Sequence, residues 1–550
     1  MKIEKKDLSK VLLILGVIVA VVGVSYALWR VSFSSTNNNS LTATCFNVSF
    51  TDQNNISIEK AYPLTDEDGK KLTPYTFTIT NNCDTYASYD INLEVLSTST
   101  LTNMNYIKMS LDDDILSLVS SLDVTTKTLS NASSAYKIKT SYLNAKESKT
   151  YNLRLWLDEN VTGETKDVQN NTFTSKITVN ASYITEEPKP TLVDYVTTLA
   201  GTDTTNLVAD DYGNVRYIGK NPNNYIKVDG EEYTSDVYYG YYSEDNLNYK
   251  TYTSLDECTT ATSFNVNCTL AHAAGEPLMW RIVGVMNNID NGSNKKEKRV
   301  KIIRSESIGN YSWDTSDSSI NSGYGINEWS QADLMKLLNP GYESESVGGS
   351  LYWNSGAGTC YNGSNDSTIG CDFTNIGFPN ELKVLIGDSV WHTGSSSSLT
   401  LESVYYDERS IDTGKRCTSG DYCNDIVTRT TSWTGKVGLM YPSDYGYATS
   451  GGNTTDRATC LNTNLSNWSK LNDCIDNAWL FDKKYSFCLT MTPYSSSNES
   501  CNVASVSKTG RLHRNRASSS SIVRPSAYLL SSVKVLSGTG TSSDPFILEN

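Results

Sequence analysis

Alternation of apolar and polar residues is the feature that most constrains how this chain can fold. Five runs before residue 186 show it, at residues 45–50, 75–80, 89–95, 150–157 and 175–183. A period of two puts every second side chain on the same face of a strand, so each run predicts a β-strand with one buried face. Turn residues between the runs, such as those at 66–69, are typical of antiparallel sheets. The sequence therefore predicts a mainly β fold with an antiparallel sandwich in this region.

The chain changes character at residues 186–192, which hold a short charged linker with two prolines, Pro188 and Pro190. A chain of 550 residues is too long for one hydrophobic core. We expect a signal peptide or membrane anchor at 1–29, a sandwich at 30–185 and a larger domain at 193–550. The larger domain is less regular and richer in Trp, Gly and Cys, which indicates an irregular α+β fold.

Local patterns predict several elements of the larger domain. Apolar runs at 278–285 and 300–304 predict paired strands joined by a loop at 287–294. Residues 330–338 predict a helix, with Ser330 and Asp333 as a capping box and Asn339-Pro340 as its end. A second helix is expected near residues 381–385.

The first 29 residues have the layout of an export signal. Four lysines (Lys2, Lys5, Lys6 and Lys10) precede an apolar run at 11–24, and Ser25-Tyr26-Ala27 places small residues for cleavage after Ala27. The apolar run extends to Trp29, so an uncleaved transmembrane anchor is the alternative. In either case we expect the rest of the chain to be extracellular or at the cell surface, with membrane contact only through residues 11–29.

The charge of the chain excludes one class of partner. Its formal net charge is −15, and it has no long basic tract. Nucleic acid is therefore not an expected partner.

Cysteine usage agrees with export. The 12 cysteines are even in number, and they fall into close sequence neighbours. Metal binding is the alternative, but Cys-x-x-Cys spacing does not occur, and the three histidines, His272, His392 and His513, are not spaced as a zinc pair. We therefore predict sequential disulfides, although sequence leaves the connectivity open: Cys45–Cys83, Cys258–Cys268, Cys360–Cys371, Cys417–Cys423, Cys460–Cys474 and Cys488–Cys501.

Two groups of residues are candidates for ligand binding. Tyr441, Tyr445 and Tyr447 offer aromatic rings that stack on sugars, and Asp444 among them could orient hydroxyls or bind calcium. The alternative is that these residues pack a core. We predict no cofactor, with calcium as the alternative at this site. Neither His272 nor His392 has a companion motif, so a core or surface position is expected for both.

The second group is basic. Arg511, Arg514 and Arg516 surround His513 and could bind an anionic sugar or sulfate. The alternative is a solvated loop that balances an acidic surface.

The N-terminal region resembles a known family. The segments 23–29, 39–44 and 77–82 are similar to the export region and the central motif of the TasA/camelysin family of secreted matrix proteins. The resemblance covers roughly residues 16–185 and implies a jelly-roll-like sandwich that assembles into fibres through its freed N-terminal strand. Cys45, Cys83 and the large second domain depart from the family. A protease activity is not carried over, because residues 1–260 contain no histidine for a zinc site.

The C-terminal region resembles an uncharacterised surface-protein domain family of low-GC Gram-positive-type gut bacteria. The resemblance covers nearly all of residues 193–550 and follows the order of the segments 278–285, 436–448, 478–480, 489–494, 523–529 and 538–546. It implies no established activity. More distantly, the region is similar to C-type-lectin-like and formylglycine-generating-enzyme folds. The latter suggests a copper-binding pair at Cys488 and Cys501, against which a plain disulfide is the alternative.

No catalytic constellation stands out in the sequence, so no catalytic residue is predicted. The sequence favours an exported surface or matrix protein that binds a surface glycan or protein ligand without catalysis. Self-assembly with further copies of the chain is also considered. The alternatives are an extracellular enzyme that acts on glycans or proteins, and a fibre-forming scaffold.

Overall fold

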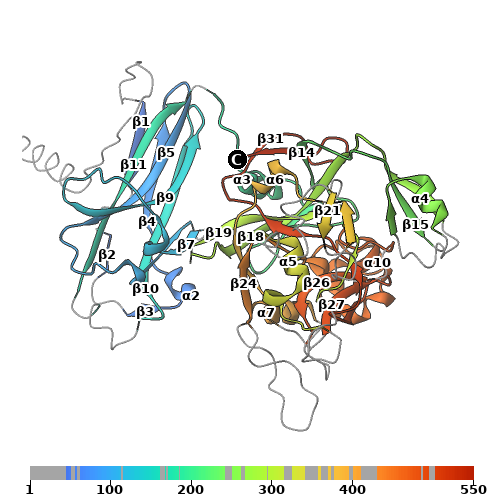
Figure 1. Cartoon of the computed structure of the whole chain (residues 1–550). Coiled ribbons are helices and arrows are strands. Elements are labelled where there is room, and N and C mark those ends of the chain that lie inside the picture. The colour runs from blue at the N-terminus through green and yellow to red at the C-terminus, as the bar shows by residue number, and fades with distance from the viewer. Residues whose placement is uncertain are drawn as a thin grey trace, which may run out of the picture. The chain divides into compact units, whose positions relative to one another are not determined.

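Figure 1 shows a computed structural model of the whole chain. The structure describes residues 45–50, 56–58, 62–112, 115–161, 168, 171–184, 186–241, 250–261, 267–293, 295–314, 325–340, 357–360, 369–372, 377–394, 400–410, 430–484, 487–494 and 502–550. The predicted export segment, with cleavage after Ala27, lies outside them. The chain divides into two compact units: the first is Met1–Pro188 with Ser293–Glu297, and the second is Lys189–Gly292 with Lys298–Asn550.

The first unit is a β-sandwich of two sheets. One sheet has the strand order β1-β4-β10-β6-β7, with β3 in parallel beside β10 and all other neighbours antiparallel. Its strands are β1 (Phe46–Phe50), β3 (Pro63–Leu64), β4 (Tyr75–Asn81), β6 (Ile107–Leu111), β7 (Ile115–Leu118) and β10 (Ser148–Asp158).

The other sheet has the order β2-β11-β5-β9-β8 and is antiparallel throughout. Its strands are β2 (Ile56–Ile58), β5 (Tyr86–Leu96), β8 (Asp123–Val124), β9 (Ala132–Leu143) and β11 (Phe173–Ile184), and the 3₁₀ turns η1 (Met104–Tyr106) and η2 (Val119–Ser121) connect other parts of the unit. The five strands that the alternation predicts are confirmed, as β1, β4, β5, β10 and β11.

The core of the first unit lies between its two sheets. Phe77 of β4 and Tyr151 of β10 meet Tyr89 of β5, and all three rings are buried. The Phe77 and Tyr151 rings stack with centroids 5.5 Å apart. The Tyr89 and Tyr151 hydroxyls, 2.6 Å apart, satisfy each other in this apolar interior.

The predicted turn at 66–69 is instead a single helical turn, α2 (Asp66–Gly69). Thr65 caps it, because its hydroxyl accepts a hydrogen bond from the Asp68 backbone N–H at 3.2 Å. Glycine is required at its end, since a Cβ at Gly69 would lie 2.3 Å from the Trp156 indole.

The second unit is built on a large sheet with the order β25-β30-β19-β18-β14-β32-β31, with β13 beside β18 and β12 beside β13. The neighbours β14 and β32 are parallel. The strands are β12 (Leu207–Ala209), β13 (Val215–Tyr217), β14 (Tyr225–Glu232), β18 (Pro277–Asp290), β19 (Lys296–Arg304), β25 (Val437–Gly438), β30 (Ser526–Tyr528), β31 (Lys534–Ser537) and β32 (Phe546–Glu549).

The two strands predicted at 278–285 and 300–304 are confirmed as β18 and β19, but the loop predicted at 287–294 is too long. Strand β18 continues to Asp290. Met286 is buried in the core and Ile289 packs against it, so their apolar contacts carry the strand past the predicted end.

The described part of this unit has four smaller sheets besides the large one. A three-stranded sheet has the order β16-β15-β17, and a five-stranded sheet has the order β20-β29-β26-β27-β28. Two further pairs are β21 with β22 and β23 with β24. The strands are β15 (Val237–Tyr241), β16 (Lys250–Tyr252), β17 (Asn267–His272), β20 (Asn310–Tyr311), β21 (Ala357–Cys360), β22 (Ile369–Asp372), β23 (Ser389–His392), β24 (Ser432–Gly435), β26 (Phe487–Pro493), β27 (Asn502–Ser507), β28 (Leu512–Arg516) and β29 (Ser521–Ile522).

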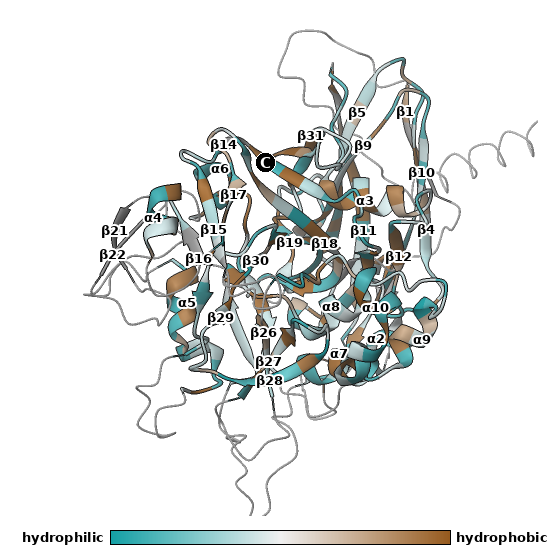
Figure 2. Cartoon of the chain, turned by 90° about the vertical axis from the view of Figure 1, so that its right-hand side faces the viewer, coloured by the Kyte–Doolittle hydropathy of each residue, from teal (hydrophilic) through white to brown (hydrophobic). Residues whose placement is uncertain are grey.

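The helices of the second unit are short: α3 (Leu192–Ala200), α4 (Leu255–Thr260), η3 (Trp329–Gln331), α5 (Asp333–Leu338), α6 (Asn380–Lys383), α7 (Leu401–Arg409), α8 (Pro442–Tyr447), α9 (Arg457–Asn462), η5 (Leu465–Lys470) and α10 (Asn472–Asp476). The helix predicted at 330–338 is split into η3 and α5, and Ala332, not Ser330, caps α5. In Figure 2 hydrophobic and hydrophilic residues alternate along α5, whose leucines are buried. Within the described residues, no helix is long and apolar enough to span a membrane.

Three of the predicted disulfides are confirmed: Cys45–Cys83, Cys258–Cys268 and Cys460–Cys474. The side chains of Cys360 and Cys371, and the residues Cys417, Cys423 and Cys501, lie outside what the structure describes.

The prediction is wrong at Cys488, which is a buried free cysteine. The register explains why. Cys488 pairs with Val506, whereas Asn502, the chain neighbour of Cys501, bonds to Tyr494 at the other end of the hairpin. Cys488 and Tyr494 are six residues apart, which is roughly 20 Å along a strand. Burial raises the pKa of the Cys488 thiol to about 12.

Candidate ligand-binding pocket of the second unit

The predicted tyrosine and aspartate site lies inside the core. Tyr441, Asp444, Tyr445 and Tyr447 belong to α8 and its N-terminal cap, and all four are buried. The Asp444 carboxylate accepts a hydrogen bond from the Tyr441 backbone N–H at 2.9 Å, and the Tyr445 hydroxyl donates to the Gly510 carbonyl at 2.6 Å. The prediction of a surface site at these residues is therefore wrong, because α8 packs under its neighbours and its aromatic residues fill the interior.

Asp444 is occupied by two cations. Lys301 Nζ lies 2.6 Å from Oδ2, and Arg216 Nη1 lies 2.9 Å from Oδ1. Arg216 also pairs with Asp210 at 2.7 Å. Burial by itself would raise the pKa of Asp444, but Lys301 and Arg216 outweigh it and hold that pKa at about 2. Both oxygens of this carboxylate therefore already have a cationic partner.

A second ion pair lies beside the first, with a buried carboxylate and an arginine whose side chain is 26% exposed. Glu408 of α7 pairs with Arg409 at 2.9 Å and accepts hydrogen bonds from the Ser443 N–H and hydroxyl at 2.9 and 2.5 Å. Burial raises the pKa of Glu408, although Arg409 opposes this. The Arg409 guanidinium stacks 3.6 Å from the centre of the Tyr405 ring. We name Asp210, Arg216, Lys301, Glu408, Arg409 and Asp444 the buried ion cluster.

The predicted basic group lies elsewhere. Arg514 and Arg516 are exposed on β28, which forms one edge of the five-stranded sheet, and Arg511 is exposed just before it. His513 between them is half-buried and stacks on Phe487. Burial, together with Arg511 and Arg514, lowers the pKa of His513. The arginines are thus near one another, but the structure does not bring them together with the tyrosines of α8.

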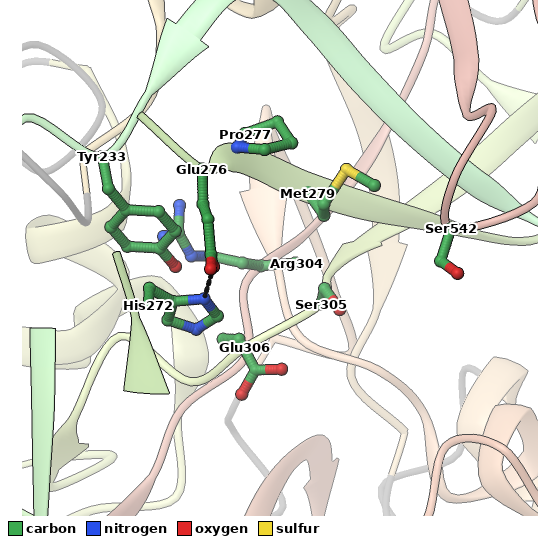
Figure 3. A pocket seen from close by; sticks show the side chains of 9 residues that line it. All are labelled: Tyr233, His272, Glu276, Pro277, Met279, Arg304, Ser305, Glu306 and Ser542. Atoms are coloured by element: carbon green, nitrogen blue, oxygen red, sulfur yellow. Dashed lines mark hydrogen bonds and ion pairs between the residues drawn. The ribbon is translucent and has the colours of Figure 1, made fainter. Parts of the chain in front are cut away.

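The described part of the second unit contains a pocket of about 240 Å³ at the junction of the large and the three-stranded sheets (Figure 3). Short connections bring its walls together. Tyr233 follows β14, His272 ends β17, and Arg304 ends β19. The full lining is Tyr233, His272, Glu276, Pro277, Met279, Arg304, Ser305, Glu306 and Ser542.

A tight turn between β17 and β18 sets the geometry of this pocket. Gly275 has a φ of +86°, a conformation that favours glycine. Its N–H donates to the Tyr233 carbonyl, and the Tyr233 N–H donates to the Glu276 carbonyl, each at 2.8 Å. The turn therefore fixes Tyr233, His272 and Glu276 next to one another.

His272 is held in a defined orientation. Its ring stacks on Tyr233 with centroids 4.3 Å apart and planes 6° apart, and the edge of Tyr239 packs against it. His272 Nδ1 lies 3.1 Å from a Glu276 carboxylate oxygen, as Figure 3 shows. Among the described residues, His272 Nε2 has no hydrogen-bond partner.

Opposite charges face each other around this histidine. Glu276 and Glu306 supply two carboxylates, and Glu306 accepts a hydrogen bond from the Tyr239 hydroxyl at 3.3 Å. Arg304 supplies a guanidinium whose positive charge acts on Tyr233. Burial raises the pKa of Tyr233, whereas Arg304 opposes that rise, so the phenol keeps its proton. The pocket thus combines a stacked pair of rings, the buried Tyr233 and the half-buried His272, with hydrogen-bond donors and acceptors.

Sequence reasoning missed this pocket. Tyr233 and Arg304 are far from His272 in the chain, and only the fold brings them together. One local signal was present: His272 and Glu276 flank Gly275, and a turn there places the two side chains together. Within the described residues, no group of three or more His, Cys, Asp and Glu side chains could hold a metal ion. The sequence also has three consecutive aspartates at 112–114, a further candidate for calcium, of which Asp113 and Asp114 lie outside the described residues.

Comparisons with known proteins add little here. No family model matches the chain, and no curated protein is similar to it. Two solved structures of a β-glucosidase from Kluyveromyces marxianus, one selenomethionine-labelled and one in complex with glucose, match at 15% and 13% identity. The matches cover 23% and 31% of this chain and 12% and 19% of those chains, each with a TM-score of 0.11. Superpositions of this quality carry no argument about fold or activity.

Proposed function

We propose that the chain is an exported cell-surface or extracellular-matrix protein whose second unit binds one sugar residue of a glycan, without catalysis. The observation that carries the proposal is the polar lining of the pocket, Glu276, Glu306 and Arg304, beside the Tyr233–His272 stack. The pocket volume of about 240 Å³ is smaller than the roughly 300–1,000 Å³ of pockets for drug-sized ligands, so it suits a single small polar ring.

The chemistry of the wall matches a sugar. Aromatic rings are amphipathic, and in this wall His272 is the half-buried ring that lines the pocket, with the buried Tyr233 behind it. Carboxylates accept two hydrogen bonds each from ring hydroxyls, and hydrogen bonds to charged groups are worth about 1.5–3 kcal/mol. His272 Nε2 adds one more polar contact, because Glu276 already engages Nδ1.

The compartment also fits. The three disulfides Cys45–Cys83, Cys258–Cys268 and Cys460–Cys474 are typical of proteins in an oxidising environment. An adhesin or a matrix component in that environment meets glycans at high density, and a small pocket gains from many weak contacts.

The test is binding of the oxidised full chain to a glycan and mucin array, with and without calcium. We expect saturable binding that Glu276→Gln and Glu306→Gln each weaken about tenfold, equivalent to about 1.4 kcal/mol. Glu402→Gln is the matched control, because Glu402 is exposed on α7 and does not line the pocket. Absence of binding to every glycan, or equal binding by all three variants, would overturn the proposal.

One observation favours an enzyme as the second candidate. Glu276 orients the His272 imidazole through Nδ1, and a carboxylate behind a histidine is an arrangement that supports general acid–base catalysis. The same array glycans, incubated with the full chain and analysed for released sugars, separate the two. Product release that His272→Gln abolishes while binding persists would make the second unit a glycan-processing enzyme.

A further inference from the structure

The closest contact in the buried ion cluster joins a lysine amine to an aspartate carboxylate. Lys301 lies on β19 and Asp444 on α8, and Nζ is 2.6 Å from Oδ2. Both side chains are completely inaccessible to solvent. The carboxylate carbon is one bond beyond that oxygen, so Nζ approaches the range of about 3–3.5 Å in which reacting atoms stand before a bond forms.

The surroundings of this pair exclude water. Rings of Tyr441, Trp391 and Tyr528 lie around the amine, with centroids 4.2, 5.0 and 5.5 Å from Nζ. All three rings are buried. Apart from Asp444, the polar contact of the amine is the Leu439 carbonyl at 3.4 Å. The absence of water favours an amide in two ways: water would hydrolyse the amide, and water is the product that leaves when the amide forms.

We propose that Lys301 and Asp444 condense into an intramolecular amide that covalently joins β19 to α8. The Lys301 nitrogen forms a bond to the Asp444 carboxyl carbon, and the bond from that carbon to Oδ2 breaks. One hydrogen stays on the amide nitrogen, and two leave with Oδ2 as water. No electron is gained or lost, and no co-reactant is needed.

Neighbouring groups support each part of this step. Arg216 Nη1, 2.9 Å from Oδ1, stabilises the negative charge that gathers on that oxygen in the tetrahedral intermediate. The ammonium proton passes to Oδ2 across the 2.6 Å contact. Burial lowers the pKa of Lys301 and favours this transfer, whereas Lys301 and Arg216, which hold the pKa of Asp444 low, oppose it. The amide carbonyl then keeps Arg216 as its donor.

The charge balance of the cluster favours the amide. Before condensation the cluster holds three cations and three carboxylates. Afterwards Arg216 keeps Asp210 and Arg409 keeps Glu408, so each remaining charge still has its partner. Two charges that burial penalises are replaced by a neutral group.

The amide would also supply what the disulfides of this unit do not. Cys258–Cys268 and Cys460–Cys474 close loops of only 10 and 14 residues. Lys301 and Asp444 are 143 residues apart, so their bond joins distant parts of the unit. A long-range cross-link of this kind constrains the unfolded chain more than a short one does.

The experiment compares full-length wild type with Lys301→Arg, which keeps a cation in the aromatic cage but cannot form this amide. Both are reduced, denatured and weighed intact by mass spectrometry. We expect wild type to be lighter than its sequence by one water and to yield a tryptic peptide in which Lys301 is joined to Asp444. The variant should carry its full sequence mass.

Wild type alone decides the question if the variant does not fold. A full-sequence mass, with the Lys301 and Asp444 peptides recovered separately, would overturn the proposal and leave an ordinary buried ion pair. Asp444→Asn adds a further check, since condensation would then release ammonia and give the same joined peptide as wild type. If that variant yields its peptide around position 444 unlinked, beside a linked wild type, the proposed exchange at this carbon is contradicted.

Discussion

Each unit contains a carboxylate buried in its core, and the two carboxylates have different kinds of partner. Glu94 of the first unit is fully buried, and its partners are neutral donors: the Thr128 N–H and hydroxyl, the Leu129 N–H and the Thr178 hydroxyl. Asp444 of the second unit is bound by two cations from distant parts of the chain. A regular sandwich can satisfy a charge with nearby strands and loops, whereas the irregular unit uses ion pairs that tie its elements together.

This contrast follows from how the cores are built. The first unit repeats one local rule, an apolar residue at every second position, and its core forms wherever the two sheets face each other. The second unit has short elements around a large sheet, and the buried ion cluster connects β13, β19, α7 and α8. We expect the second unit to be the more sensitive to loss of a single buried charge.

The largest effect is expected for Arg216→Met. Removing this guanidinium leaves Asp210 buried without its cation, which typically costs about 3–5 kcal/mol. In urea unfolding of the full chain, the transition of the second unit should shift to lower urea while that of the first unit stays in place. Arg514→Met, at an exposed position on β28, is the control and should change the free energy of unfolding by less than about 0.5 kcal/mol. If Arg216→Met and Arg514→Met shifted the urea transition of the second unit equally, its dependence on buried charges would be contradicted.

A smaller effect is expected for Tyr151→Phe in the first unit. The substitution keeps the stacked ring but removes the hydroxyl that lies 2.6 Å from that of Tyr89. Loss of one neutral hydrogen bond typically costs about 1 kcal/mol. The measurement is the midpoint of the first unit's transition in the same urea series. A loss as large as that of Arg216→Met would show that the sandwich depends on buried polar contacts as strongly as the second unit does.

The smallest effect concerns pH. The pKa of His513 is lowered from 6.5 in the folded state, so as the pH falls below 6.5 the unfolded chain binds the proton first. The free energy of unfolding should therefore decrease as the pH is lowered from 6.5, and should stop decreasing once the pH is below the folded-state pKa of His513. His513→Gln should remove under about 1 kcal/mol of this loss, since the half-exposed ring is screened by solvent. Chemical denaturation of wild type and variant above and below pH 6.5 measures this loss of unfolding free energy. If the variant loses more stability in acid than wild type does, the predicted effect of His513 has the wrong sign.

Much of the fold could be predicted from sequence, but little of the site. Strands β1, β4, β5, β10 and β11 follow from alternation, since a sandwich strand carries its burial pattern in its own residues. Three cysteine pairs follow from joining each cysteine to its next neighbour among the cysteines of the sequence. The failure at Cys488 has the opposite cause, because a hairpin register is set by contacts that spacing does not record.

The aromatic residues around Asp444 show the same limit. A run of tyrosines beside an acid is equally compatible with a sugar-binding surface and with a packed helix. The deciding residues were Lys301 and Arg216, which are remote in sequence. The pocket was missed for a related reason: His272 and Glu276 are local, but their meaning depends on Tyr233, Arg304 and Glu306.

The central claim is that ligands reach the second unit at His272 and not at the buried or basic residues. The chain has three histidines, so isotope-labelled histidine gives three imidazole signals that His272→Gln and His513→Gln assign. The measurement is an NMR titration of the labelled full chain with methyl glycosides of hexoses, N-acetylhexosamines and sialic acid. We expect one glycoside to move the His272 signal in a saturable way while His392 and His513 stay unchanged. A saturable shift of His513 with His272 unmoved would place the site at the arginines of β28 and contradict the account.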